Sequence, residues 1–215
     1  MKGIHAQGGL PIPGIHHIDQ PDWWSEGGDM SPEAFGLARA RQLEEKILEL
    51  GPETVAAFIA EPVQGAGGVI VPPESYWPEI QRIVQKYDIL LILDEVITGF
   101  GRTGNWFGCQ TLGITPDIMT CAKGITSGYI PLGASIVSDR IAEVINGDEF
   151  AHGYTYSGHP VSCAAALKNI EILERDKILE HVREIAPYFQ ERLARLARFP
   201  VIGDARGHGL IGCIE

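Results

Sequence analysis

The run Ile89-Leu90-Leu91-Ile92-Leu93, followed at once by Asp94-Glu95, decides the fold. Five consecutive apolar residues leave no polar face for solvent, which is typical of a strand in a parallel sheet that is covered on both sides. The run ends in two acids, and polar residues at the carboxyl ends of such strands face the ligand crevice. The sequence therefore predicts an α/β fold with a site beside Asp94.

The segments around this strand alternate between helical and extended patterns. Ser31-Pro32-Glu33 combines an N-cap with a first-turn proline, and the helix that follows is predicted to end at Gly51. Further strands are expected at 55–60, 118–121 and 134–137, and a second helix from Pro73 to about Tyr87. This order predicts a mostly parallel, three-layer arrangement of sheet and helices, joined by right-handed crossovers.

The two ends of the chain differ from its middle. Residues 1–30 are rich in Gly, Pro, His and Trp and show no period, which predicts an irregular segment. After Pro160 the pattern becomes helical, at about 161–173 and 177–198, before a last apolar segment at 209–214. We expect 1–160 to be part of a large domain and 161–215 to hold linking helices and the start of a smaller one. Both ends look cut rather than finished.

Composition excludes several classes of protein. The chain has 45% hydrophobic residues and a net charge of −11, so attraction to nucleic-acid phosphates is not expected. It has no apolar run of about 20 residues that could cross a membrane and no signal peptide, which predicts a cytoplasmic protein. Its four cysteines lie far apart and its histidines lack ligand spacing, so no metal site is expected.

Three polar residues follow predicted strands, namely Glu61, Asp94 and Lys123. Each has an ordinary alternative, as a solvated acid, a turn cap and an exposed lysine respectively. An apolar strand that ends in Asp-Glu also resembles the magnesium-binding strand of P-loop nucleotidases. That class needs G-x-x-x-x-G-K-[ST], whereas the sequence has only the reversed order Lys123-Gly124.

Lys123 lies among small residues directly after an apolar strand, in the segment AKGITSGY at 122–129. Small neighbours allow a bulky planar group to approach the amine. A lysine in an apolar crevice loses its proton more easily than in water, and the neutral amine is the form that attacks a carbonyl. This context favours a lysine that forms a Schiff base.

Four segments resemble the successive motifs of class III pyridoxal-phosphate (PLP) aminotransferases, in the same order and spacing. They are EPVQG at 61–65, DEVITGFGRTG at 94–104, AKG at 122–124 and GYTYSGHP at 153–160. The residues of these motifs are most similar to those of omega-amino acid:pyruvate transaminases, and the segment GLPIPG at 9–14 shares this similarity. The resemblance implies the large domain of PLP-transferase fold type I and the transfer of an amino group from an amine or omega-amino acid to a 2-oxo acid such as pyruvate.

The resemblance also implies roles for single residues. Lys123 would form the Schiff base with PLP and then move the substrate proton, and Asp94 would keep the pyridine nitrogen protonated. Val96, on the same side of the strand as Asp94, would pack against the ring. Thr155 would reach the cofactor phosphate of a neighbouring subunit, which implies a homodimer with shared sites. Glu61 resembles the acid beside the substrate channel.

Three glycines in the 94–104 segment, Gly99, Gly101 and Gly104, are interpreted as residues that permit tight turns beside the cofactor. They are not interpreted as a dinucleotide-binding fingerprint, because a glycine-rich stretch alone is weak evidence for one. The surrounding motifs give these glycines their significance.

The sequence resembles only the middle of the family's longer chains. The phosphate-binding turn, the aromatic residue on the other face of the ring and the later carboxylate-binding arginine have no counterpart in it. A phosphate dianion needs several donors, and Thr155 supplies one of them. We therefore expect this chain alone to be a poor or inactive aminotransferase. The alternatives are a noncatalytic truncated subunit or a fragment of a larger aminotransferase, and a related PLP-dependent aminomutase or decarboxylase.

Overall fold

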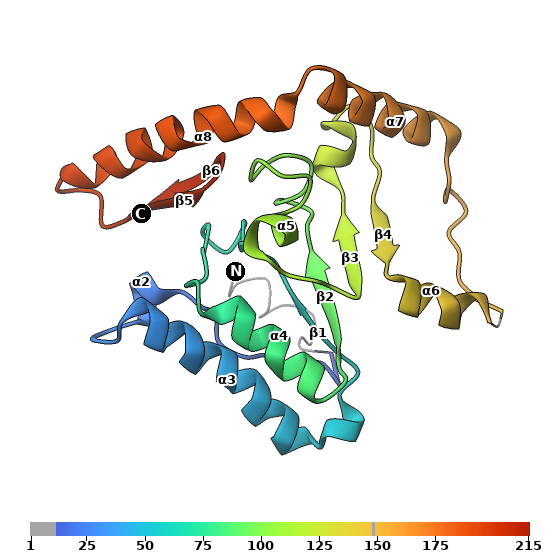
Figure 1. Cartoon of the computed structure of the whole chain (residues 1–215), viewed down its shortest axis with the longest axis horizontal. Coiled ribbons are helices and arrows are strands. Elements are labelled where there is room, and N and C mark those ends of the chain that lie inside the picture. The colour runs from blue at the N-terminus through green and yellow to red at the C-terminus, as the bar shows by residue number, and fades with distance from the viewer. Residues whose placement is uncertain (1–11, 148) are drawn as a thin grey trace.

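A four-stranded sheet forms the centre of the computed structural model, which describes residues 12–147 and 149–215 (Figure 1). The strands lie in the order in which they follow along the chain. They are β1 (Ala57–Ala60), β2 (Leu90–Asp94), β3 (Ile118–Cys121) and β4 (Ala134–Val137). β1, β2 and β3 are parallel to one another, and β4 is antiparallel to β3. The predicted α/β class with a mostly parallel sheet is confirmed.

The last strand corrects one expectation. The chain between β3 and β4 contains only the 3-10 turn η2 (Lys123–Thr126) and no crossover helix, so β4 returns antiparallel instead of following a right-handed crossover. The helix α6 (Asp139–Asn146), which the sequence did not predict, follows β4. The strand lies where the sequence predicted it, and one antiparallel strand is consistent with the mostly parallel sheet that was expected.

Two helices pack against each other beside the sheet (Figure 1). α3 (Pro32–Leu50) begins after the N-cap Ser31 and ends at Gly51, as predicted, and the short 3-10 turn η1 (Pro52–Thr54) follows. α4 (Tyr76–Lys86) begins three residues later than expected, because Pro73 belongs to the preceding turn. The main core joins α3, α4 and β2 through Ala40, Leu43, Ile47, Ile80, Ile83, Val84, Leu91 and Leu93.

The C-terminal part consists of two long helices and a hairpin. α7 (Pro160–Arg175) and α8 (Ile178–Ala194) run along the top of Figure 1, and the hairpin lies below α8. The 3-10 turn η3 (Arg195–Arg198) leads to β5 (Ala205–His208), which pairs with β6 (Ile211–Ile214). The sequence predicted only the second of these strands. A domain boundary at 160, where α7 begins, stays a prediction.

Two short helices complete the described part. α2 (Trp23–Glu26) lies within the region expected to be irregular, and α5 (Gly108–Leu112) follows the glycine-rich segment after β2. Residues 9–11 of the GLPIPG segment lie outside the described residues. Within 12–147 and 149–215, no helix is long and apolar enough to span a membrane.

Candidate active site

The register of the parallel strands brings the ends of β1, β2 and β3 to one edge of the sheet. Ala60 is paired with Leu93, so Glu61 follows next to Asp94. Asp94 is paired with Thr120, and Lys123 comes three residues later. The carboxyl ends of parallel strands form the ligand crevice of open α/β sheets. The structure therefore places Glu61, Asp94 and Lys123 along this edge, which we call the carboxyl edge.

Asp94 ends β2 with a half-buried carboxylate. Its Oδ1 accepts a hydrogen bond of 3.0 Å from the backbone N–H of Val96. Val96 lies in the turn that follows β2 and not in the strand, so the expectation that it continues the alternation of the strand is wrong. The turn begins here because the Asp94 carboxylate binds the backbone two residues later, as in an Asx-turn.

Glu95 is fully buried, and sequence reasoning assigned it no role. Its Oε2 accepts a hydrogen bond of 2.8 Å from the N–H of Gly108 and another from the hydroxyl of Thr98. Its Oε1 accepts one of 2.6 Å from the N–H of Cys109. Glu95 thus ties the turn after Asp94 to the start of α5. The signal in the sequence that could have indicated this role is the second acid directly after Asp94.

Lys123 opens η2 with a φ of 41°, in the left-handed region that is unfavourable for a residue with a side chain. Its side chain is exposed, so the expected apolar crevice around the amine is not formed by the described residues. Asn169 of α7 holds the backbone of η2, because its Nδ2 donates to the carbonyl oxygens of Gly124 (2.9 Å) and Ile125 (3.2 Å). Asn169 was not predicted and comes from a different part of the chain.

The turns after β2 and β3 pack against each other. A Cβ on Gly124 would lie 2.9 Å from the Cβ of Phe100, which leaves no room for a side chain at Gly124. Gly101 and Gly104 have φ values of 90° and 92°, so both fit the predicted role as residues that permit tight turns. The backbone next to Lys123 is therefore held from both sides.

The candidate residues line two cavities at the carboxyl edge. One cavity of about 730 Å³ is lined by Glu61 and Asp94, together with Gln64 and the segment 14–21. The other, of about 500 Å³, is lined by Val96 and Lys123, together with Arg102 and Ser127. The hydrogen bond between Asp94 and Val96 joins the walls of the two cavities. The structure thus brings four of the five predicted residues together, although not into one cavity.

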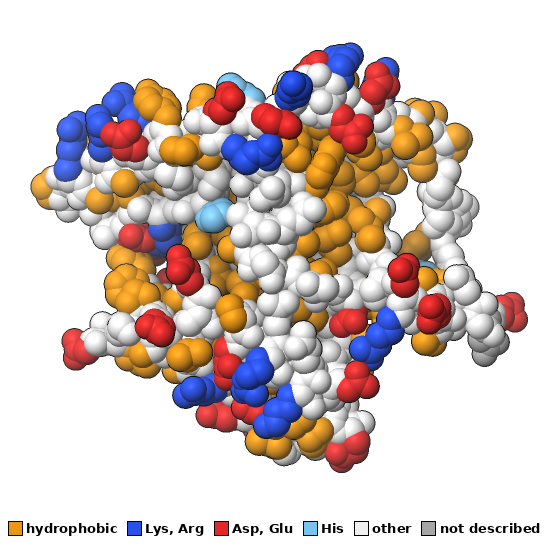
Figure 2. Space-filling model, in the orientation of Figure 1, with side chains coloured by type: hydrophobic (Ala, Val, Ile, Leu, Met, Phe, Trp, Pro, Cys, Tyr) orange, Lys and Arg blue, Asp and Glu red, His pale blue; other side chains and the backbone are white. Residues whose placement is uncertain are grey.

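Thr155 lies apart from these residues. It is exposed on a turn in the segment between α6 and α7, which runs along the right side of Figure 1, beyond β4. Its neighbours Tyr154 and Tyr156 line a third cavity of about 870 Å³, next to Ala122 and Leu132. Apolar side chains also gather below α7 in Figure 2. Thr155 is not among the residues that line either cavity at the carboxyl edge.

Titration and metal ligation give no further site at this edge. Burial and the charge of Glu95 raise the pKa of Cys109 to about 12, but Cys109 is not among the residues that line the two cavities at this edge. Among the described residues, no group of three or more His, Cys, Asp or Glu side chains could hold a metal ion.

Comparison with known proteins gives one consistent result. The family model "Aminotransferase class-III" matches residues 2–215. The chain is 62% identical, over its whole length, to the putrescine–pyruvate aminotransferase of Pseudomonas aeruginosa and covers 48% of that protein. It is 49% identical, over 98% of its length, to a probable gamma-aminobutyrate transaminase 3 of Oryza sativa subsp. indica and covers 42% of that protein.

Solved structures agree with these relatives. An (S)-enantioselective omega-transaminase from Thermomicrobium roseum matches the whole chain with a TM-score of 0.95 and 49% identity, and the chain covers 48% of it. The omega-transaminase from Pseudomonas jessenii in complex with PMP matches the whole chain with a TM-score of 0.97 and 44% identity, and the chain covers 49% of it. The chain spans about half the length of the curated relatives that it matches.

Proposed function

This chain belongs to the class-III aminotransferases, and we propose that it provides the carboxyl edge on which PLP is bound and an amino group is transferred. The donor is an amine or an omega-amino acid, and the acceptor is a 2-oxo acid such as pyruvate. The observation that carries this proposal is the strand register that brings Asp94 and Lys123 to the same edge.

The residues at this edge fit PLP chemically. A carboxylate can accept about four hydrogen bonds. Within the described part of the chain, the Asp94 carboxylate accepts one hydrogen bond, from the N–H of Val96. Asp94 can therefore also accept one from a protonated ring nitrogen. The Lys123 amine has no ion pair within the described part of the chain and is accessible to a planar aldehyde. The strained backbone of Lys123 adds support, since residues with such φ values cluster at functional sites.

The bound cofactor would supply an electron sink for the carbanion that forms when the substrate loses a proton. Lys123 would bind the cofactor and move that proton with its Nζ. Asp94 would hold the proton of the ring nitrogen, and the N–H of Val96 keeps this carboxylate oriented. Val96 would pack against the ring, and Glu61 would face the substrate.

Thr155 supports a homodimer with shared sites. Its hydroxyl is exposed and lies outside the two cavities at the carboxyl edge, so it is available to a second subunit. In this proposal Thr155 donates to the cofactor phosphate of the partner. The mixture of acidic and basic groups on the surface seen in Figure 2 and the net charge of −11 give no basis for a nucleic-acid partner.

The relatives suggest which amine to test first. The higher identity, 62%, is to a protein named putrescine–pyruvate aminotransferase, and the gamma-aminobutyrate transaminases follow at 49%. We therefore propose a primary amine at the end of an aliphatic chain as the donor and pyruvate as the acceptor. Relatives named as transaminases favour this reaction over an aminomutase or a decarboxylase.

The proposal is tested by fixing PLP to the protein. The purified chain is incubated with PLP, reduced with borohydride and mapped by peptide mass spectrometry. We expect the pyridoxyl group on Lys123 and its loss in Lys123→Arg, which keeps the charge but cannot form the adduct. Lys168→Arg is the matched control, because Lys168 is exposed and paired with Glu171 on α7.

Two results would speak against this function. If the label is spread over several lysines and is unchanged in Lys123→Arg, Lys123 is not a cofactor-binding residue. If Lys123 is labelled but putrescine, gamma-aminobutyrate and other terminal amines produce no alanine from pyruvate, the chain binds the cofactor without catalysing transfer. The second result would favour the noncatalytic alternative.

A further inference from the structure

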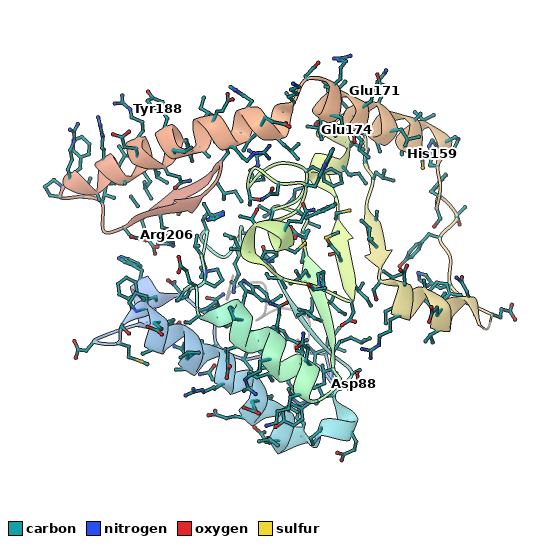
Figure 3. The ribbon with its side chains drawn as sticks, in the orientation of Figure 1. Asp88, His159, Glu171, Glu174, Tyr188 and Arg206 are labelled. Atoms are coloured by element: carbon teal, nitrogen blue, oxygen red, sulfur yellow. The ribbon has the colours of Figure 1, made fainter. Side chains whose placement is uncertain are left out.

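Arg206 of β5 connects parts of the chain that are far apart in sequence. Its side chain is 15% exposed, and it lies on the side of the hairpin that faces α2 (Figure 3). Its Nε and Nη2 donate to the carbonyl oxygen of Gly68 at 3.0 and 2.7 Å, and its Nε also donates to that of Val69 at 3.2 Å. The guanidinium also lies over the ring of Trp24, 5.6 Å from its centre.

Two carboxylates hold the guanidinium in this position. Asp204 accepts from Nη1 at 2.6 Å, and Glu215 accepts from Nη2 at 2.8 Å. Both acids belong to the C-terminal hairpin region, so they fix the guanidinium to the hairpin. A planar guanidinium with donors in fixed directions can bind these acids and two backbone carbonyls at once, which the ammonium of lysine cannot do.

The turn that Arg206 holds, residues 65–69, has an unfavourable backbone. Val69 is β-branched and has a φ of 52°, a conformation that such residues rarely adopt. Within the turn, the N–H groups of Gly68 and Val69 both donate to the carbonyl oxygen of Gly65, at 3.1 and 3.0 Å. A strained turn persists only when its surroundings determine it. The hydrogen bonds from Arg206 to the carbonyl oxygens of Gly68 and Val69 hold the turn in this conformation.

The same turn orients an acid of the carboxyl edge. The N–H of Gly65 donates to Oε2 of Glu61 at 2.9 Å. Glu61 lines the cavity of about 730 Å³ that Asp94 also lines. A continuous series of contacts therefore runs from Arg206 through Gly68 and Gly65 to Glu61. It joins the C-terminal hairpin to the site, although Arg206 and Gly68 are 138 positions apart in the sequence.

We propose that Arg206 is a positioning residue that holds the turn 65–69 and, through Gly65, sets the direction of the Glu61 carboxylate. The hairpin and the carboxyl edge are thereby coupled, so a shift of the hairpin changes the position of Glu61. Only the meaning of Glu61 for the substrate rests on the proposed function, since the coupling itself is a property of the fold.

Hydrogen exchange on the full 215-residue chain tests this coupling. In Arg206→Ala we expect the amides of Gly65, Gly68 and Val69 to exchange roughly tenfold faster or more, because bonds from a charged donor are lost and the turn opens. In Arg206→Lys, which keeps the charge but not the fork, part of this protection should return. The amides of β2 serve as an internal reference and should keep their exchange rates.

Matched variants separate coupling from general loosening. Arg195→Ala removes an exposed arginine that pairs with Glu191 within one helix turn, and it should leave the turn 65–69 unchanged. Glu61→Gln should affect the amide of Gly65 more than those of Gly68 and Val69, because only Gly65 donates to this side chain. If Arg206→Ala does not fold, the exchange rates of the turn amides in Arg206→Lys and in the wild type are compared instead, and they decide whether Arg206 holds the turn. Unchanged exchange in the turn in every folded Arg206 variant would overturn the coupling.

A second measurement keeps this inference apart from the proposed function. With an active enzyme, Arg206→Ala should raise the KM for the amine donor more than it lowers kcat, while borohydride still labels Lys123. If exchange responds as expected but Lys123 of the wild type is never labelled, the proposed function fails and the positioning role of Arg206 stands. If Lys123 is labelled but exchange in the turn 65–69 does not change in the Arg206 variants, the proposed function stands and the positioning role of Arg206 fails.

Discussion

The two adjacent acids at the end of β2 have opposite surroundings. Asp94 is half-buried and faces a cavity, whereas Glu95 is fully buried and accepts hydrogen bonds from Thr98, Gly108 and Cys109. A buried carboxylate is costly unless hydrogen bonds replace its hydration. Glu95 meets this condition through two backbone N–H groups and a hydroxyl. It holds the turn from which Val96 binds Asp94.

Replacing Glu95 with Gln should destabilise the chain. The amide keeps the shape of the side chain but turns one acceptor oxygen into a donor that faces N–H groups. We expect the free energy of unfolding to fall by about 2–4 kcal/mol, because charged hydrogen bonds are lost and buried donors are left without acceptors. Urea denaturation followed by circular dichroism measures this change.

The matched control for Glu95→Gln is Glu45→Gln, at an exposed position of α3. This surface change should alter the free energy of unfolding by no more than about 0.5 kcal/mol. Equal effects of the two variants would mean that the buried network does not stabilise the turn after β2.

At the scale of elements, α3 and α6 both follow a serine but are capped differently. The Oγ of Ser31 accepts a hydrogen bond of 3.2 Å from the N–H of Ala34 at the start of α3. Ser138 precedes α6 without a side-chain cap, and its Oγ is buried and has no partner among the described residues. The same residue type therefore stabilises one helix through its side chain and not the other.

Alanine at these two positions should reveal the difference. Ser31→Ala should lower the free energy of unfolding by about 1 kcal/mol, because one N–H of the first turn of α3 loses its acceptor. Ser138→Ala should leave it nearly unchanged or raise it slightly, since a buried hydroxyl without a partner is removed. Urea denaturation of both variants checks this, and a larger loss in Ser138→Ala would show that α6 is capped after all.

At the scale of the whole molecule, several buried weak acids resist ionisation. Burial and the nearby charge of Glu95 raise the pKa of Cys109 to about 12, and the same two causes raise the pKa of Cys121. Burial also raises the pKa of Tyr76 in α4 well above its usual value. These groups belong to the core, so their protonation state is linked to folding as a whole.

The chain should therefore lose stability in alkali. Below about pH 9, the usual pKa of a thiol, Cys109 is protonated in both states and its contribution is intact. As the pH rises toward about 12, the unfolded state releases the proton first and is favoured, by about 1.4 kcal/mol per pH unit for each such group. Urea denaturation at a series of pH values from 8 to about 10.5 measures the slope.

Cys109→Ala isolates the thiol in this experiment. In the variant, the free energy of unfolding should fall less steeply with pH than in the wild type, by the equivalent of about one proton released on unfolding. This difference is expected whatever the change in absolute stability. Equal slopes in the two proteins, or a free energy of unfolding that does not depend on pH in this range, would show that Cys109 ionises as readily in the folded state as in the unfolded one.

Local patterns in the sequence determined the helices and strands whose stabilising interactions lie within the element itself. The apolar run before Asp94 predicted β2, and Ser31 with Pro32 predicted the start of α3. Four motifs predicted the family, which the comparisons confirmed. In each case the deciding interactions lie within a few residues, in a cap, a turn or an alternation of apolar side chains, so the order of residues is sufficient.

Tertiary structure alone decided the features that depend on distant contacts. The antiparallel direction of β4 depends on how the chain after Lys123 reverses, and the exposure of Lys123 depends on what packs around it. The partners of Glu95 and the bonds from Arg206 to Gly68 join residues that are far apart in sequence. No local pattern encodes such pairs, because their free energy exists only once the segments have been brought together.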